Sequence, residues 1–503
     1  EPPSKGISGE QLVRKTWLNQ THLRTVRPLA VMAAAALAAS LAACSGGSAD
    51  GPLGATVTGN GVETKVQRDD FIAKKEALDP SDASFAGAIV ADEPTAALIA
   101  RGVLEKGGAA ADAATALYFA LSVTYPWAAG LGGGGVCLAR DTKQPDVQSI
   151  AFLARRPVEG GPFAIPGNVR GFALLHAKYG SMRWAELVSP AERLAASGFP
   201  VSRALDRQLR DAGIVIVNSA DLQRLYTVNN ERTYRELDTL SEVQLASTLA
   251  QVRSRGVDGF YQGATARLLV DQAKAKGGKL TRADLADYRP EIGAAQSMTA
   301  GDMLAMLPPK GLGAGAFSSA LWSNIRSARD AAGLASAAEQ TATALGAPAG
   351  AALDADFGST SFAVVDGKGG AVACAVTMNG AFGSGSAAEG SGVVFASSPE
   401  APVKGLASAF LAPVMLVNAN SKALYFVGAG AGAPKGAAAI EHAAQAALAN
   451  GNDALPALAS GPADAASPAN AIVCPDGLPA GACSMGVAEK GFGVGLGAVN
   501  SGS

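Results

Sequence analysis

The sequence predicts a layered α/β fold in which helices cover a core of β-sheet. Ala-rich segments with helical periodicity and glycine stops fill the first half of the chain. Apolar, strand-like runs joined by Gly-rich turns dominate the second half, with helices between them. Hydrophobic residues make up 48% of the 503 residues, which suffices for one large core or for two to three ordinary domains.

The first half is expected to begin with two Ala-rich amphipathic helices on either side of the stop at residues 107–108. The four glycines 132–135 then lead into a strand over 136–140. Such a run of glycines lets backbones approach closely, and it is more often a packing device than a site. Helical segments continue to about residue 290, where Thr281 and Asp284 predict a capping box at the start of a short helix.

The second half is expected to contain a β-hairpin, because the apolar runs SFAVV and AVACAVTMN flank the tight turn DGKGG. The segment before it, residues 349–361, is interpreted as an exposed loop. More strands are predicted in 392–398 and 410–430, then a helix over 435–451 and a strand from residue 471.

A glycine and three hydroxyl residues stand at the mouth of this hairpin: Gly358, Ser359, Thr360 and Ser361. Two interpretations are open. Serine and glycine are common turn residues at the start of a strand, so the cluster can be a plain turn. The cluster can also carry a nucleophilic hydroxyl.

Charge and metal-ligand content exclude several classes of function. The chain has 41 basic and 43 acidic residues, so nothing indicates a nucleic-acid partner or a polybasic membrane surface. It has three histidines and no CxxC pair, and we expect neither a metal site nor a cofactor.

The first 43 residues are expected to include an export signal. Arg24 and Arg27 precede an apolar run over 29–43, which is too short to span a membrane and ends in small residues before Cys44. The ending Leu-Ala-Ala-Cys resembles a bacterial lipobox, which makes Cys44 a lipidation site; a plain secretory signal is the alternative. We therefore expect a periplasmic protein that is attached to the membrane through a lipid anchor only. Because Ser follows the Cys, the outer membrane is the expected one. Residues 44–70 are interpreted as a tether and 71–503 as the folded domain.

The other cysteines fit an oxidising compartment. Cys474 and Cys483 bracket a turn-rich loop and are predicted to form a short disulfide. Cys137 and Cys374 each lie in an apolar, strand-like run and are expected to be buried small hydrophobic residues.

Four blocks of sequence, in order, resemble the γ-glutamyltranspeptidase (glutathione hydrolase) family. They are GGAAADAATALYFALSVTYPWAAGLGGGGVCL, IPGNVRGFALLHAKYGSM, FYQGATARLLVDQAKAKGGKLTRADLADYR and STSFAVVDGKGGAVACAVTMNGAFGSG. The resemblance runs from about residue 71 to the C-terminus, with residues 300–355 shortened and divergent. It implies the αββα sandwich of the N-terminal-nucleophile hydrolases, whose members cut their own chain into a large and a small subunit.

The resemblance assigns the nucleophile to Ser359, where the family usually has Thr, and the cleavage to the bond between Gly358 and Ser359. The subunits would then be the chain up to residue 358 and residues 359–503. This chemistry needs no histidine, because a free α-amine titrates near neutrality and acts as the base for its own side-chain hydroxyl. Serine keeps the nucleophile but lacks the methyl group that helps to fix the threonine rotamer.

Other matched positions complete the catalytic set. Thr377 lies where the family has a Thr that hydrogen-bonds the nucleophile, and Asn379 matches an Asn that contacts the α-amino end of the substrate. Ala431 and Gly432 stand at the Gly-Gly pair whose backbone amides form the oxyanion hole, and a backbone N–H survives substitution by Ala.

The substrate clamp of the family departs from its pattern here. Leu153 stands where the family has the Arg that binds the donor's α-carboxylate, with Arg155 displaced by two residues. Glu400 lies one residue out of register with the family's Asp, and Ser408 lies beside the position of its Ser-Ser pair. Losing a bidentate Arg–carboxylate contact weakens donor binding, so a free α-amino acid head group is a poor expectation for the tight substrate.

Two functions follow from different classes of protein. The first is an autoprocessed amidohydrolase with a small-molecule γ-glutamyl or other amide substrate. The second is a catalytically degenerate envelope lipoprotein that keeps the same fold as a scaffold or a binding module.

Overall fold

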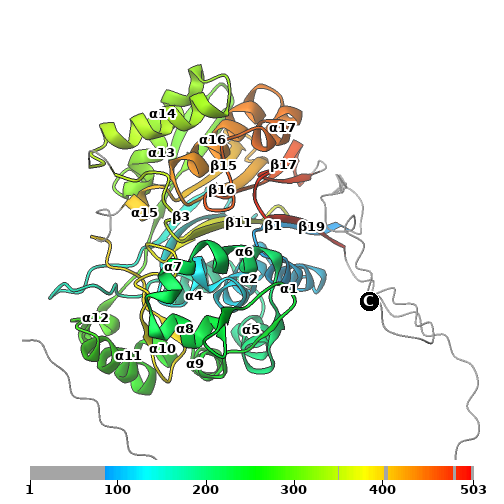
Figure 1. Cartoon of the computed structure of the whole chain (residues 1–503). Coiled ribbons are helices and arrows are strands. Elements are labelled where there is room, and N and C mark those ends of the chain that lie inside the picture. Colours follow the sequence, from blue (N-terminus) through cyan, green and yellow to red (C-terminus); the bar gives the residue numbers. More distant parts are fainter. Residues whose placement is uncertain (1–84, 349–350, 401–405, 480–482, 500–503) are drawn as a thin grey trace, which may run out of the picture. The chain divides into compact units, whose positions relative to one another are not determined.

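Two antiparallel β-sheets lie face to face in the centre of the computed structural model, and helices cover both outer faces (Figure 1). The structure describes residues 85–348, 351–400, 406–479 and 483–499. All of them lie in one compact unit, Gln67–Ser503. The layered α/β fold predicted from the sequence is therefore the observed one.

The first sheet has seven strands in the order β19-β1-β11-β12-β2-β3-β8. Every neighbouring pair is antiparallel. The predicted hairpin forms its middle, where β11 and β12 lie between β1 and β2. The strands are β1 Phe85–Ala91, β2 Gly134–Arg140, β3 Gln148–Phe152, β8 Glu291–Ala294, β11 Ser359–Asp366, β12 Ala371–Thr377 and β19 Val494–Val499.

The second sheet has six strands in the order β18-β17-β16-β15-β10-β9. They are β9 Gln296–Ala300, β10 Met303–Leu307, β15 Ala412–Asn418, β16 Leu424–Gly430, β17 Ala469–Leu478 and β18 Ser484–Val487. Small and branched apolar side chains from both sheets, such as Ala373, Val427 and Ile472, form one buried cluster between them. Small residues let the two sheets approach closely, which accounts for the high Ala and Gly content of these strands.

Three short hairpins complete the strands: β4 Phe199–Pro200 with β7 Thr239–Leu240, β5 Thr227–Val228 with β6 Arg232–Thr233, and β13 Ala387–Ala388 with β14 Val393–Val394. The strand predicted over 392–398 is thus reduced to two residues. Its continuation makes only isolated bridges, from Phe395 to Gly132 and from Ser397 to Phe163.

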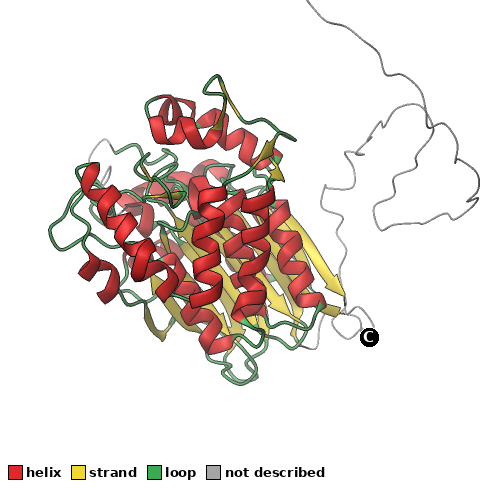
Figure 2. Cartoon of the chain, turned by 90° about the horizontal axis from the view of Figure 1, so that it is seen from below, coloured by secondary structure: helices red, strands yellow, loops and turns green. Residues whose placement is uncertain are grey.

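The helices of the first half cover the outer face of the first sheet, as Figure 2 shows from below. The central helix of this layer is α2 Ala110–Thr124, which is buried along its whole length. The others are α1 Pro94–Glu105, α3 Pro126–Ala129, α4 Asn168–Tyr179, α5 Trp184–Ser197, α6 Arg203–Asp211, α7 Gly213–Val217, α8 Ala220–Tyr226, α9 Val243–Arg255, α10 Asp258–Tyr261, α11 Gly263–Ala275 and α12 Arg282–Asp287. The capping box predicted for α12 is present, with Thr281 and Asp284 bonding each other's backbone N–H.

A second helical layer covers the other sheet. It comprises α13 Gly313–Asn324, α14 Ala331–Ala344, α15 Leu406–Ala409, α16 Pro434–Ala449, α17 Ala454–Ala459 and the 3₁₀ turns Ile325–Ser327 and Gly451–Asp453. The segment before β11 was expected to be an exposed loop, and at its end this was wrong. Phe357 is only 3% exposed, and its ring lies 5.5 Å from that of Phe410. Burying this aromatic ring fixes the chain just before Ser359.

Candidate functional site: a buried hydroxyl at the sheet interface

Ser359 is the first residue of β11, and its side chain is fully buried. Its hydroxyl donates a hydrogen bond to Oγ1 of Thr377, at 2.8 Å. Thr377 lies directly opposite Ser359 in the β11–β12 register, which explains why residues 18 apart in the sequence meet. The backbone N–H of Asn379 donates to the same Oγ1 at 3.0 Å. The structure thus brings together three of the predicted site residues.

Gly358 is held in a conformation that only glycine fits. Its φ is +58°, and a Cβ built there would lie 1.9 Å from the carbonyl oxygen of Gly380. Its carbonyl oxygen accepts a hydrogen bond from the Met378 N–H at 2.9 Å and lies 3.2 Å from Oγ1 of Thr377. The peptide bond to Ser359 therefore has a carbonyl that is already polarised by a donor.

Asp356 fixes the other side of this glycine. Its Oδ1 accepts a hydrogen bond from the Gly358 N–H at 2.7 Å. Burial raises the pKa of Asp356 to about 7. The carboxyl group changes its charge near neutral pH at two residues from the predicted cleavage bond.

A buried polar network supports the next two hydroxyls, and the sequence interpretation did not identify it. Thr360 donates to Oδ2 of Asp92 at 2.5 Å. Asn470, on β17 of the other sheet, donates to Oδ1 of Asp92 at 2.8 Å and lies 3.0 Å from Oγ of Ser361. Burial raises the pKa of Asp92, and its hydrogen bonds oppose that rise. The network joins the two sheets beside Ser359; the polar pair Asp92-Glu93 after an apolar strand was the available signal.

The predicted oxyanion residues follow β16, the strand that packs against β11 and β12. The N–H of Ala431 donates to the carbonyl of Pro468 at 3.0 Å, so this amide is engaged. Gly432 has φ +86°, and a Cβ there would lie 2.2 Å from the Ala466 carbonyl oxygen. Within the described residues, the Gly432 amide is the one of the pair that has no internal acceptor. Their role in an oxyanion hole stays a prediction.

A cavity of about 630 Å³ lies close to the hydroxyl groups of Ser359 and Thr377. The link runs through Asn379, whose Oδ1 is 3.5 Å from Oγ of Ser408, a residue of the cavity wall. Ser359, Thr377, Ala431 and Gly432 are not part of that wall. Its lining combines the predicted substrate residues Arg155, Glu400 and Ser408 with apolar side chains, among them Leu153, Leu312, Phe317, Leu345, Leu406 and Phe410.

The charged groups of this cavity are paired with each other. Arg155 forms an ion pair with Glu291 at 2.5 Å, and its guanidinium lies 4.9 Å from the centre of the Tyr288 ring. Arg156 pairs with Glu400 at 3.2 Å. Leu153 lines the cavity where the family has its clamping Arg. A ligand carboxylate would therefore compete with a glutamate for either arginine.

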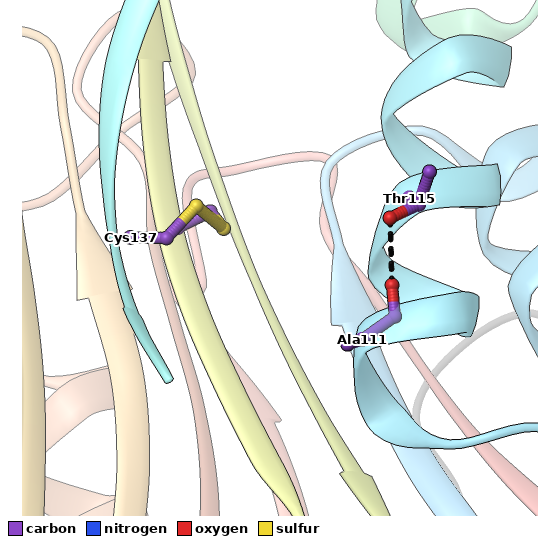
Figure 3. The surroundings of a disulfide bond; sticks show 4 residues. Ala111, Thr115 and Cys137 are labelled. Carbon is purple, nitrogen blue, oxygen red and sulfur yellow. Dashed lines mark hydrogen bonds between the residues drawn. A yellow bond between two sulfur atoms is a disulfide. The ribbon is translucent and has the colours of Figure 1, made fainter. Parts of the chain in front are cut away.

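Two disulfides are present in the described residues. Cys474 and Cys483 are joined, as their spacing predicted. Cys137 and Cys374 are fully buried, as expected, but they are also joined to each other, which the sequence interpretation did not predict. Their disulfide lies on the face of the first sheet that α2 covers, where Thr115 of that helix donates to the Ala111 carbonyl (Figure 3).

Comparison with solved structures supports the fold. The chain superposes on the crystal structure of cephalosporin acylase from Bacillus halodurans with a TM-score of 0.66 at 17% sequence identity, covering 86% of this chain and 99% of that one. Two face-to-face sheets between helical layers form an αββα sandwich. This is the αββα fold that the sequence resemblance implied.

Part of the chain matches a known protein family. Residues 96–322 match the family described as Gamma-glutamyltranspeptidase. The glutathione hydrolase proenzymes of Bacillus subtilis strain 168 and Escherichia coli K12 are 34% and 32% identical over 224 residues, which is 40% of this chain and 38% of each of them. The chain thus spans about two fifths of the length of these curated relatives. These matches confirm the resemblance to the γ-glutamyltranspeptidase family over that part of the chain, which ends before the hairpin of Ser359.

Proposed function

We propose that this protein is an amidohydrolase of the γ-glutamyltransferase type, autoprocessed before Ser359. The observation that carries the proposal is the hydrogen bond between the hydroxyls of Ser359 and Thr377 at the end of a peptide fixed on both sides of Gly358. The arrangement supplies the Ser359 hydroxyl as a nucleophile and, directly before it, a rigid left-handed glycine whose carbonyl is polarised.

Self-cleavage would proceed through an ester. The Ser359 Oγ attacks the carbonyl carbon of Gly358, its proton passes to the departing amide nitrogen of Ser359, and the C–N bond breaks. The Met378 N–H, 2.9 Å from that carbonyl oxygen, stabilises the developing oxyanion. Water then hydrolyses the ester, leaving a carboxylate on Gly358 and a free hydroxyl and α-amine on Ser359.

Turnover would reuse the same hydroxyl. The new α-amine of Ser359 has an ordinary pKa of about 7.7–8.0, so it can take the proton of its own hydroxyl near neutral pH. Attack on an amide substrate forms an acyl-enzyme and releases an amine. Water or a second amine then resolves the acyl-enzyme by transfer of the acyl group.

The cavity favours an apolar acyl group over a γ-glutamyl group with a free α-amino acid head. Leu153 offers no charge to an α-carboxylate, and Arg155 and Arg156 are each already paired with a glutamate. The apolar remainder of the wall instead suits a hydrocarbon or aromatic acyl group of moderate size.

The alternative function, a scaffold or binding module without catalysis, is favoured by one observation. Ser359 is fully buried and does not line the cavity. In that case the chain is not cut before Ser359, which is only a structural residue at the start of β11. The cavity then binds a ligand without catalysis.

A reducing denaturing gel of the purified protein distinguishes the two functions. If the protein is the proposed enzyme, the gel shows two bands, from a fragment that ends at Gly358 and a fragment that begins at Ser359. Ser359→Ala then shows one band. Ser359→Thr is the matched control, because it restores the residue that the resembling family uses and retains cleavage. A wild-type protein that stays a single band for days rules out the proposed enzyme. Cleaved protein is then assayed with γ-glutamyl and phenylacetyl anilides, and we expect faster turnover of the apolar donor.

We also propose that the protein is exported and lipid-anchored through Cys44, which lies outside the described residues. The support is the apolar run and lipobox-like ending before Cys44. Across the described part of the chain, no helix combines the length and apolar character that a membrane crossing needs. Incorporation of labelled palmitate in bacterial cells, abolished by Cys44→Ala, tests the anchor; an unlabelled wild type refutes it.

A further inference from the structure

The disulfide Cys137–Cys374 joins two parts of the chain that lie on opposite sides of the proposed cleavage bond. Cys137 belongs to β2 and Cys374 to β12, and the two residues are directly opposite in the antiparallel register. They are 237 residues apart in the sequence, with the bond 358–359 between them. The other disulfide, Cys474–Cys483, lies wholly within residues 359–503.

We propose that Cys137–Cys374 is a covalent link between the two subunits of the mature protein. This inference rests on the proposed self-cleavage, because only a broken chain has two fragments to link. Once the 358–359 bond is cut, the disulfide is the sole covalent connection between the fragments among the described residues. The fragments 44–358 and 359–503 then behave as one disulfide-bonded molecule.

The sheet explains what such a link would preserve. Strands β11 and β12 of the small fragment lie between β1 and β2 of the large fragment, so each fragment completes the other's sheet. Cys374 is three residues before Thr377 on the same strand. Without a link, unfolding of the cleaved protein separates two chains and refolding requires their encounter. With the link it stays unimolecular, and the sheet that the two fragments share can re-form at any dilution.

The bond would have to form during folding. Both cysteines are fully buried, and helix α2 covers their face of the sheet, so the folded protein shields them from thiols and oxidants. Formation removes two protons and two electrons from the two thiols, and a protein disulfide oxidant accepts them and becomes a dithiol. Such oxidants are found in the compartments to which export leads, which agrees with the proposed localisation.

Denaturing gels run with and without reductant test the inference. The protein is denatured in the presence of N-ethylmaleimide, which blocks any buried thiol as it becomes exposed, so that no disulfide forms or exchanges. We expect one band without reductant and two with it. Two bands under both conditions overturn the link while leaving self-cleavage intact. One band under both conditions overturns self-cleavage, and with it the linked pair of fragments.

Matched variants identify the cysteines that carry the link. Cys137→Ala/Cys374→Ala is expected to give two bands without reductant, whereas Cys474→Ala/Cys483→Ala is expected to keep the single unreduced band. If the first variant fails to fold, mass spectrometry of a non-reduced proteolytic digest of the wild type takes its place. A peptide pair joined through Cys137 and Cys374 supports the inference, and alkylated Cys137 peptides overturn it.

Concentration dependence gives an independent measurement. The melting temperature of the cleaved wild type is expected not to change over a hundredfold dilution, since the unfolded molecule stays in one piece. The cleaved Cys137→Ala/Cys374→Ala variant is expected to melt at lower temperatures as it is diluted. A wild type whose melting temperature falls in parallel with that of the variant contradicts a covalent link.

Discussion

The hydroxyl cluster at the start of β11 and the cavity beside it are built in opposite ways. Around Ser359 the partners are neutral hydroxyls and backbone groups, buried between two sheets and fixed by strand register. The lining of the cavity is largely apolar, and its arginines are already engaged in ion pairs with glutamates. On the proposed function, the contrast means that the bond-breaking chemistry and the choice of substrate are separable. The cavity could then change its ligand without disturbing the nucleophile.

Among substitutions in the hydroxyl cluster, Gly358→Ala is expected to have the largest effect on stability and on self-cleavage. A Cβ there would lie 1.9 Å from the Gly380 carbonyl oxygen, and the backbone φ of +58° strains any residue with a side chain. The strain alone costs about 1–3 kcal/mol, and the clash adds to it. We expect a clear fall in melting temperature and no self-cleavage on a reducing gel.

Gly311→Ala is the control for this substitution, because its Cβ would meet no atom within 4 Å. It should melt within a degree or two of the wild type and cleave normally. If Gly358→Ala behaves like the control, then the left-handed glycine is not required for either folding or cleavage.

Removing the hydroxyl of Thr377 should have the next largest effect. Thr377→Val keeps the shape of the side chain but deprives Ser359 Oγ of its 2.8 Å partner and leaves the Asn379 N–H unpaired. We expect the rate of self-cleavage to fall about 100-fold, as is typical for loss of a positioned proton-transfer group. Time courses of band formation measure it.

Thr377→Ser separates the hydroxyl from the methyl group. The variant should cleave within a few-fold of the wild-type rate, since the hydrogen bond to Ser359 is retained. Equal rates for the valine and serine variants would show that Thr377 acts only through packing.

Leu153→Arg tests whether the cavity selects the acyl donor. A guanidinium at this position restores the group that the resembling family uses, at the wall of the same cavity. One charge-assisted hydrogen bond to a donor carboxylate contributes about 1.5–3 kcal/mol, so we expect kcat/KM for a γ-glutamyl anilide to rise about tenfold or more.

Leu153→Met is the neutral control of similar volume, and it should leave that kcat/KM unchanged. Turnover of the apolar anilide should fall in Leu153→Arg only. No gain with the γ-glutamyl donor would mean that Glu291 or Glu400 holds the new arginine as it holds the present ones.

The sequence predicted what depends on local pattern and on neighbouring strands. The hairpin follows from two apolar runs around a tight turn, and the disulfide of Cys474 and Cys483 follows from their spacing; the Ser359–Thr377 pair was implied by the family resemblance. Contacts between distant strands were beyond it. Nothing in two separate apolar runs indicates that Cys137 and Cys374 are opposite each other, because sheet order is set by the whole fold.

The cavity shows the same limit. Arg155 and Glu400 were predicted to bind the substrate; both line the cavity, and their role stays a prediction. Their pairing with Glu291 and Arg156 depends on how β8 and the segment after β14 meet β3, which no local pattern records. The Ala431 amide is engaged by Pro468, at the start of β17, for the same reason.

The smallest effect is expected from Asp356→Asn, measured in the uncleaved Ser359→Ala background. Burial raises the folded-state pKa of Asp356 from 3.8 to about 7. Between these values the folded chain keeps a proton that the unfolded chain has released, so stability falls as the pH rises from about 4 to 7. Asparagine can accept the same Gly358 N–H bond but does not titrate.

We therefore expect the variant to gain about 1–3 °C in melting temperature relative to its background at pH 8 and nothing at pH 4. Glu242, whose pKa burial also raises to about 7, is present in both proteins and cancels in the difference. A melting-temperature difference that is the same at both pH values would show that the Asp356 carboxyl titrates normally beside Gly358.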